Sequence, residues 1–146
     1  MSLPEDRESR REIGEELKSN PGFESVDRLI GFLLGDGGCP WDRSRRLADC
    51  PEYIKSELDE VIEAIGTDEG TDIEEELGDL LFMVVFTARV AKNEGKITID
   101  GLYRRILEKM VFRHPHIFGG EMDADSAEQV VDNWQKLKMQ EKESDT

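Results

Sequence analysis

The hydrophobic positions of this chain recur at the spacing of amphipathic helices. Residues 25–34 and 51–65 each carry apolar side chains at intervals of three and four, which places them on one face of a helix. Between them, the segment GDGGCPWD contains several glycines and Pro40, and it predicts a structured loop. The two apolar stripes consist of Val26, Leu29, Ile30 and Leu33, and of Ile54, Leu58, Val61, Ile62 and Ile65.

The longest apolar run, LLFMVVF at residues 80–86, lies in a segment without helix breakers. Asp72 and Glu75 have the spacing of a helix N-cap and its capping-box partner, and Asn93 begins the closing segment NEG. We therefore expect one helix of about 20 residues here rather than a buried strand. Because this helix is apolar nearly all round, it should be buried on every side. A chain of this size would need a partner subunit to cover part of it.

The ends of the chain predict further helices. One begins near Leu102 and must end by His114, because Pro115 follows. Another covers residues 126–140, and the highly charged residues 4–18 predict a weak or frayed helix. Together the pattern predicts an all-α fold with five or six helices and no strand.

Composition narrows the class of protein. The chain has 146 residues, enough for one domain with a real core, and a formal net charge of −15. Such a charge repels nucleic acid and anionic membranes, so we expect neither as a partner. No apolar run is long enough to span a bilayer, and the N-terminus does not resemble a signal peptide. Cys39 and Cys50 lack the spacing of a zinc site and indicate reduced thiols in the cytoplasm.

Eleven acidic residues and no basic ones lie in SELDEVIEAIGTDEGTDIEEELGD, residues 56–79. Most have ordinary explanations, because loop acids are solvated and the first turn of a helix favours negative charge. Asp59 and Glu63 lie opposite the apolar stripe of their helix and should face solvent. The acids without such an explanation are Glu57, Glu60, Glu76 and Asp79.

These four acids form two pairs at i, i+3, each on neighbouring positions of one helix. On a helical wheel, Glu57 lies at the edge of the apolar stripe of its helix, and Glu60 lies outside that stripe. Two antiparallel helices could bring both pairs together as an oxygen-only cluster, which is the ligand set that Mg²⁺ or Mn²⁺ prefers. The alternative is an ordinary buried ion pair. Asp79 lies on the same helix face as Phe82, Met83 and Phe86, and this apolar face should be covered. The buried carboxylate could then pair with a basic residue from a distant part of the chain.

Cationic and aromatic residues recur in the last third of the chain. Lys109 and Arg113 are spaced i, i+4 on one predicted helix, and Trp134 and Lys138 have the same spacing on another. Cations of this kind could hold a phosphate chain beside a metal, and the tryptophan could stack on a base. The alternative is that Trp134 is a core residue.

Five segments occur in an order that resembles the MazG-type nucleoside triphosphate pyrophosphohydrolases: GCPWD, SELDEVIEAI, EELGDLLFMVVFTARVA, EKMVFRHPHIFG and VVDNWQKLKMQEK. The similarity covers roughly residues 25–142. It implies a MazG-like helical bundle whose subunits pack as a homodimer or as a homotetramer built from two dimers. Residues 1–20 would then be an N-terminal extension, and 21–146 the helical domain. The implied activity is cleavage of nucleoside triphosphates to monophosphate and pyrophosphate with Mg²⁺ or Mn²⁺, which clears non-standard or surplus nucleotides.

The resemblance also implies roles for individual residues. The family's metal motif falls on Glu57, Glu60, Glu76 and Asp79, and its nucleotide contacts fall on Lys109, Arg113, Trp134 and Lys138. We expect Glu57 or Glu60 to take the proton of the attacking water.

Two positions depart from the family pattern, because Ser56 stands where many members have Glu and Thr87 where the usual residue is His. Two other functions remain open. One is a related all-α enzyme that acts on dUTP or phosphoribosyl-ATP. The other is a catalytically silent dimer that binds nucleotide or protein.

Overall fold

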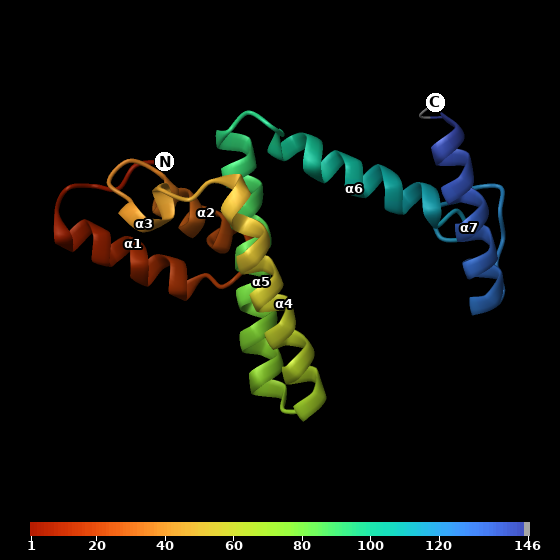
Figure 1. The fold of residues 1–146 in the computed structure, drawn as a ribbon, viewed down its shortest axis with the longest axis horizontal. Coiled ribbons are helices and arrows are strands. Elements are labelled where there is room, and N and C mark those ends of the chain that lie inside the picture. Colours follow the sequence, from red (N-terminus) through yellow and green to blue (C-terminus); the bar gives the residue numbers. More distant parts are fainter. Residues whose placement is uncertain (145–146) are drawn as a thin grey trace. The chain divides into compact units, whose positions relative to one another are not determined.

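The structure is a computed structural model that describes residues 1–144. Within that range all regular elements are helical, apart from one isolated bridge between Ser2 and Asp36 (Figure 1). The prediction of an all-α fold is therefore confirmed. The elements are α1 (Arg7–Ser19), α2 (Phe23–Leu34), α3 (Pro40–Arg43), the 3-10 helix η1 (Leu47–Asp49), α4 (Cys50–Thr67), α5 (Gly70–Asn93), α6 (Ile99–Arg113) and α7 (Ala127–Ser144).

Residues 1–144 thus contain seven α-helices, more than the five or six expected. The additional helix is α3, which forms a single turn inside the segment predicted as a loop, with Pro40 in its first turn.

Helix α1 is capped by Asp6, whose side chain accepts a hydrogen bond from the Ser9 N–H. Glu16 of α1 pairs with Arg28 of α2 and joins these two helices.

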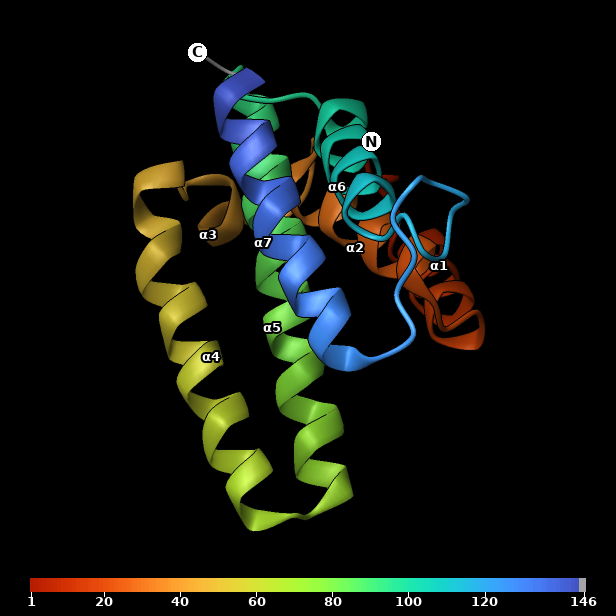
Figure 2. The ribbon, with the colours of Figure 1, turned by 90° about the vertical axis from the view of Figure 1, so that its right-hand side faces the viewer.

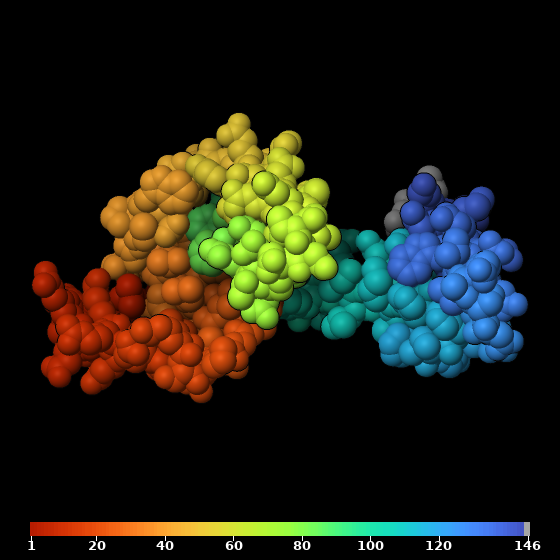
Figure 3. All heavy atoms as spheres, turned by 90° about the horizontal axis from the view of Figure 1, so that it is seen from below, coloured from red at the N-terminus to blue at the C-terminus, as the bar shows by residue number. Residues whose placement is uncertain are grey.

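Helices α4 and α5 form an antiparallel hairpin, and they lie side by side along their length (Figure 2). The end of this hairpin, viewed end-on in Figure 3, is a short turn through Asp68 and Glu69. Asp68 has a left-handed backbone with φ of 59°, which ends α4 and reverses the chain. Helix α5 begins at Gly70 with Glu69 as its N-cap, so the predicted N-cap at Asp72 lies three residues too late.

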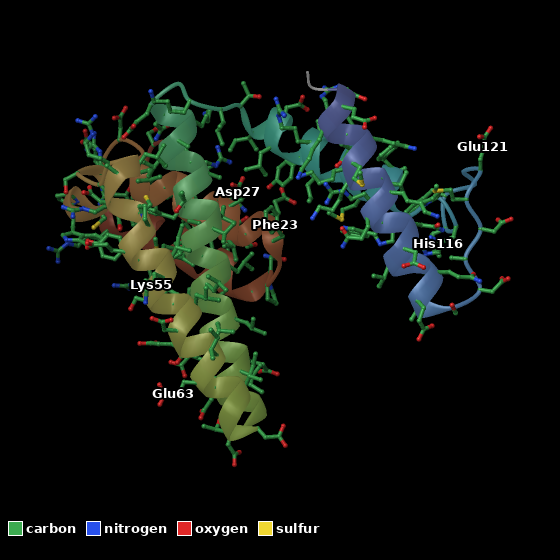
Figure 4. The ribbon with its side chains drawn as sticks, turned by 45° about the vertical axis from the view of Figure 1, so that its right-hand side comes forward. Phe23, Asp27, Lys55, Glu63, His116 and Glu121 are labelled. Atoms are coloured by element: carbon green, nitrogen blue, oxygen red, sulfur yellow. The ribbon has the colours of Figure 1, made fainter. Side chains whose placement is uncertain are left out.

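The core of this part of the molecule lies where α2 and α4 pack on the second half of α5. Ile30, Cys50 and Phe86 are almost completely buried there, together with Val85 and Val90. Arg89 of α5 pairs with Asp27 of α2 at the edge of this core, and Asp27 lies beside α5 in Figure 4. These contacts fix the position of the hairpin relative to α2.

Helix α5 is not buried on every side in the single chain, and the expectation that a partner subunit covers the remainder stays a prediction. The hairpin instead carries exposed apolar side chains at spacings of four and three on both helices. Ile62 is 60% exposed, for example. Because the exposed residues recur at helical spacing, those on each helix lie along one face of it. The exposed residues are Leu58, Ile62 and Ile65 on α4, and Leu77, Leu81 and Val84 on α5.

The contacts divide the chain into two compact units. The first, Met1–Ile97, contains α1 to α5, and the second begins at Thr98 and contains α6 and α7, which pack on each other. No helix within residues 1–144 combines the length and the apolar character needed to cross a membrane.

Candidate functional site

The hairpin brings the four selected carboxylates together. Because the chain reverses at residues 68–69, position 57 lies opposite position 80 and position 60 opposite position 77. Carboxylate oxygens of Glu57, Glu76 and Asp79 accordingly lie within 4.8 Å of one another. The Glu60 carboxyl group makes a hydrogen-bond contact with that of Glu76. We call these four residues the carboxylate cluster.

Burial and mutual repulsion raise the pKa values of two members of the cluster. The pKa of Glu76 rises to about 7, first because the group is buried, and then because of its hydrogen bond with Glu60 and the nearby negative charges. Burial, followed by the charges of Asp79 and Glu60, also raises the pKa of Glu57. The Oε2 atom of Glu76 is buried and has no hydrogen-bond partner. The folded chain therefore holds negative charge here without compensation.

Within residues 1–144, none of the ion pairs includes a member of the carboxylate cluster. Lys55, the nearest preceding base in α4, pairs with Asp59 instead. The alternative of a buried ion pair with a distant base therefore has no support in this part of the chain. Asp79 is exposed in the single subunit, although its neighbour Phe86 is buried, so the expected burial of Asp79 is wrong at this level.

The composition of the cluster fits a hard divalent cation. All its donors are carboxylate oxygens, which Mg²⁺ and Mn²⁺ prefer, and it contains no thiol or imidazole. The unpartnered Glu76 oxygen needs a positive partner, because a buried polar atom without one is costly. The exposed members leave one side of the cluster open to a ligand. Glu57, Glu76 and Asp79 could thus hold a cation, with Glu60 next to them.

Stability without metal should depend on the protonation of Glu76. Burial raises the pKa of Glu76 from its ordinary value of 4.5 to about 7 in the folded protein. The stabilising contribution of the protonated carboxyl group is therefore complete below pH 4.5 and is lost as the pH rises through 7. Glu76→Gln imitates the protonated group. In urea unfolding with EDTA at pH 8, this variant should be more stable than the wild type, and its advantage should shrink at pH 5.

The matched control for this experiment is Glu74→Gln, which removes an exposed acid from the same helix. It should retain the difference between pH 5 and pH 8 that the wild type shows. An equal pH response of all three proteins would contradict the raised pKa of Glu76.

The second unit gathers the predicted cationic and aromatic residues. The guanidinium of Arg113 lies 5.3 Å from the ring centroid of Trp134, and the ring of His114 stands edge-on to the same indole. Arg113 also donates hydrogen bonds to Glu141, with 3.2 Å between Nε and Oε2. Trp134 is partly buried, so it packs in the interior to some extent, as the alternative of a core residue required. It also contacts the Arg113 cation.

A cavity of about 770 Å³ opens beside these residues, and Lys109, Arg113 and Lys138 line it. Glu141 lies on the same wall, and its pKa is lowered chiefly by the hydrogen bond from Arg113 and also by the charges of both lysines. Sequence reasoning missed Glu141. The available signal was its helical spacing of three from Lys138 and seven from Trp134. The cavity has the size of a small-molecule site and an excess of positive charge.

The two positions that depart from the expected pattern have simple surroundings. Thr87 donates a hydrogen bond from Oγ1 to the carbonyl of Met83, 2.7 Å away, so its hydroxyl is satisfied inside α5. Ser56 is exposed on α4 and directly precedes Glu57.

Comparisons with known proteins agree with the residues described above. Residues 47–118 match the MazG nucleotide pyrophosphohydrolase domain. A nucleoside triphosphate pyrophosphohydrolase of Escherichia coli is 35% identical over 124 residues, which are 82% of this chain and 47% of that protein. The nucleoside triphosphate pyrophosphohydrolase/pyrophosphatase MazG of Thermotoga maritima is 38% identical over 120 residues, 82% of this chain and 45% of that protein. The chain thus spans about half the length of these relatives.

A solved structure is also similar to this chain. The crystal structure of a mazG-related protein from Thermotoga maritima superimposes with a TM-score of 0.65 at 26% identity. The match covers 86% of this chain and 98% of that one. The helical architecture described above is therefore that of a known fold.

Proposed function

Since the chain belongs to the MazG nucleotide pyrophosphohydrolase family, we propose that it hydrolyses nucleoside triphosphates to monophosphate and pyrophosphate. The observation that carries this proposal is the carboxylate cluster of the α4–α5 hairpin, with Glu57, Glu76 and Asp79 within 4.8 Å. Three uncompensated carboxylates would repel a triphosphate, so the substrate requires a cation at this place. We assign that role to Mg²⁺, with Mn²⁺ as a substitute.

In this mechanism the cluster residues have two tasks. Glu57, Glu76 and Asp79 hold the cation, which when bound neutralises phosphate charge and lowers the pKa of a coordinated water. Glu60 and Glu57 are the candidates to accept the proton of the attacking water. Glu60 is exposed and in contact with Glu76, so it can reach both the cluster and solvent.

The cavity of the second unit is suited to binding the nucleotide. Lys109, Arg113 and Lys138 supply positive charge for a phosphate chain, and Trp134 supplies an aromatic face. In the absence of a bound anion, the ion pair with Glu141 fixes the position of the Arg113 side chain. The positive charge of these side chains is complementary to the negative charge of a polyphosphate. This complementarity supports the proposal independently of the carboxylate cluster.

Self-association follows from the exposed apolar residues of the hairpin. Both α4 and α5 carry such residues at helical spacing, and surfaces of this kind are covered in stable proteins by another subunit. We therefore propose that the chain works as a homodimer or a homotetramer, with the hairpin in the interface.

A panel of triphosphates tests the proposed activity. With Mg²⁺ or Mn²⁺, the protein should release pyrophosphate from nucleoside triphosphates, and EDTA should abolish that release. Activity that survives EDTA would overturn the metal mechanism. Selective turnover of dUTP or phosphoribosyl-ATP would identify the rival enzyme, and binding without turnover of any substrate would identify a silent nucleotide-binding protein.

A further inference from the structure

Three arginines converge at the end of the hairpin that lies away from its turn. The chain passes from α3 into η1 and places Arg43, Arg45 and Arg46 around a cavity of about 240 Å³. Asn93 and Glu94, at the C-terminal end of α5, complete the polar wall. This concentration of positive charge is unexpected in a chain with a net charge of −15. The proposed pyrophosphohydrolase mechanism uses none of these residues.

Arg45 is held in place by several contacts. Its guanidinium lies 4.5 Å from the ring centroid of Trp41, and Nε donates to the Trp41 carbonyl oxygen. Nη1 donates to the Tyr53 hydroxyl and Nη2 to Ser44 Oγ, at 3.4 and 2.9 Å. An arginine fixed in this way loses little side-chain entropy when a ligand binds.

The charges around the cavity leave a surplus for an anion. Glu94 is the acidic residue of the lining, and its Oε1 is shared between Arg46 and the backbone N–H of Leu47. Arg43 approaches Asp36 at 3.6 Å, but the Asp36 side chain is 92% exposed and is screened by water. Three arginine residues and one glutamate give the lining residues a formal net charge of +2. A doubly charged anion would balance it.

The size and the position of the cavity identify the class of ligand. Its volume is below the roughly 300 Å³ at which pockets for drug-sized molecules begin, so it suits a phosphate group rather than a whole nucleotide. Glu94 follows Asp79 by fifteen residues on α5, which is about 22 Å at 1.5 Å per residue. The cavity is thus separate from the carboxylate cluster.

We propose that Arg43, Arg45 and Arg46 form a binding site for a small phosphate-type dianion, independent of the metal cluster. Guanidinium groups bind such anions through paired N–H···O bonds, and three arginine residues line one cavity here. The ligand is either inorganic phosphate itself or the phosphate group of a larger metabolite.

Isothermal titration of EDTA-treated protein with inorganic phosphate at constant ionic strength tests this site. The wild type should show saturable phosphate binding that depends on Arg46, and sulfate should compete for it. Arg46→Gln should weaken binding about tenfold or more, because a hydrogen bond to a charged partner contributes about 1.5–3 kcal/mol. Arg46 is 76% exposed, so the variant should fold normally, which circular dichroism would verify. Arg46→Lys retains the charge and should bind with intermediate affinity.

The matched control is Arg104→Gln, which removes an exposed arginine that is paired with Asp100 on α6. It should bind phosphate like the wild type. Absence of saturable binding, or equal binding by Arg46→Gln and wild type, would overturn the proposal. A phosphate monoester without a base, glycerol 3-phosphate, separates the two ligand sources in a parallel titration, since its tighter, Arg46-dependent binding would point to a phosphate group on a larger molecule. The titration uses neither metal nor triphosphate, so its result is independent of the proposed hydrolysis.

Discussion

Replacing Glu76 by Gln should lower kcat/KM for nucleoside triphosphate hydrolysis by about 100-fold or more. Loss of a group that only hydrogen-bonds to a metal ligand costs about 10–100-fold, and loss of a ligand itself should cost more. Glu76 contributes a buried oxygen without a partner to the carboxylate cluster, and an amide cannot replace the charge that attracts the cation. Pyrophosphate release at saturating Mg²⁺ is the measurement, with circular dichroism to confirm that the helices remain.

Glu74→Gln serves as the control for this variant, because it removes one exposed charge from the same helix and should leave activity within about twofold. Asp79→Asn gives an independent second test and should also lose most activity. If Glu76→Gln turned over substrate like Glu74→Gln, the carboxylate cluster would not be the catalytic centre. If none of the proteins turned over substrate, the silent binding protein would be favoured.

Replacing Ile62 by Asp should convert the assembled protein to single chains. Ile62 lies at the centre of the exposed apolar row on α4, and burying an unpaired carboxylate in an interface costs several kcal/mol. That cost corresponds to a weakening of association by about a thousandfold or more. The molar mass from light scattering after size-exclusion chromatography is the measurement.

The control for the interface is Glu63→Gln, which changes a neighbouring exposed residue that points away from α5 in Figure 4. It should leave the molar mass of the assembly unchanged. A wild-type protein that elutes as a single chain, or an Ile62→Asp variant that still assembles, would contradict the proposed interface.

Periodicity predicted most of the helices but misplaced one end. The end of α5 at Asn93 and the end of α6 before His114 were predicted, because a glycine or a proline stops each helix locally. The start of α5 was not, because Asp72 and Glu75 imitate a capping box. The left-handed Asp68 turns the chain earlier and lets the helix begin at Gly70.

The carboxylate cluster could be predicted because it depends on short-range rules. Two i, i+3 pairs on either side of a tight turn must meet when the helices are antiparallel. Contacts that depend on packing between helices distant in sequence could not be predicted. Glu141 meets Arg113 across the α6–α7 interface, and the arginine cavity requires the end of α5 to lie beside η1. Composition also does not show which faces of α5 one chain covers, so the partner subunit expected to cover the remainder stays a prediction.

The sparse packing of α6 and α7 has a consequence for how the protein must be handled. Among the described residues from Thr98 onward, Leu137 is the only one that is buried. In the single chain, this helix pair leaves many of its large apolar side chains in contact with solvent, and we expect a partner subunit to cover them. The folded fraction of the pair should therefore rise with protein concentration, and melting temperatures measured at different dilutions would not be comparable.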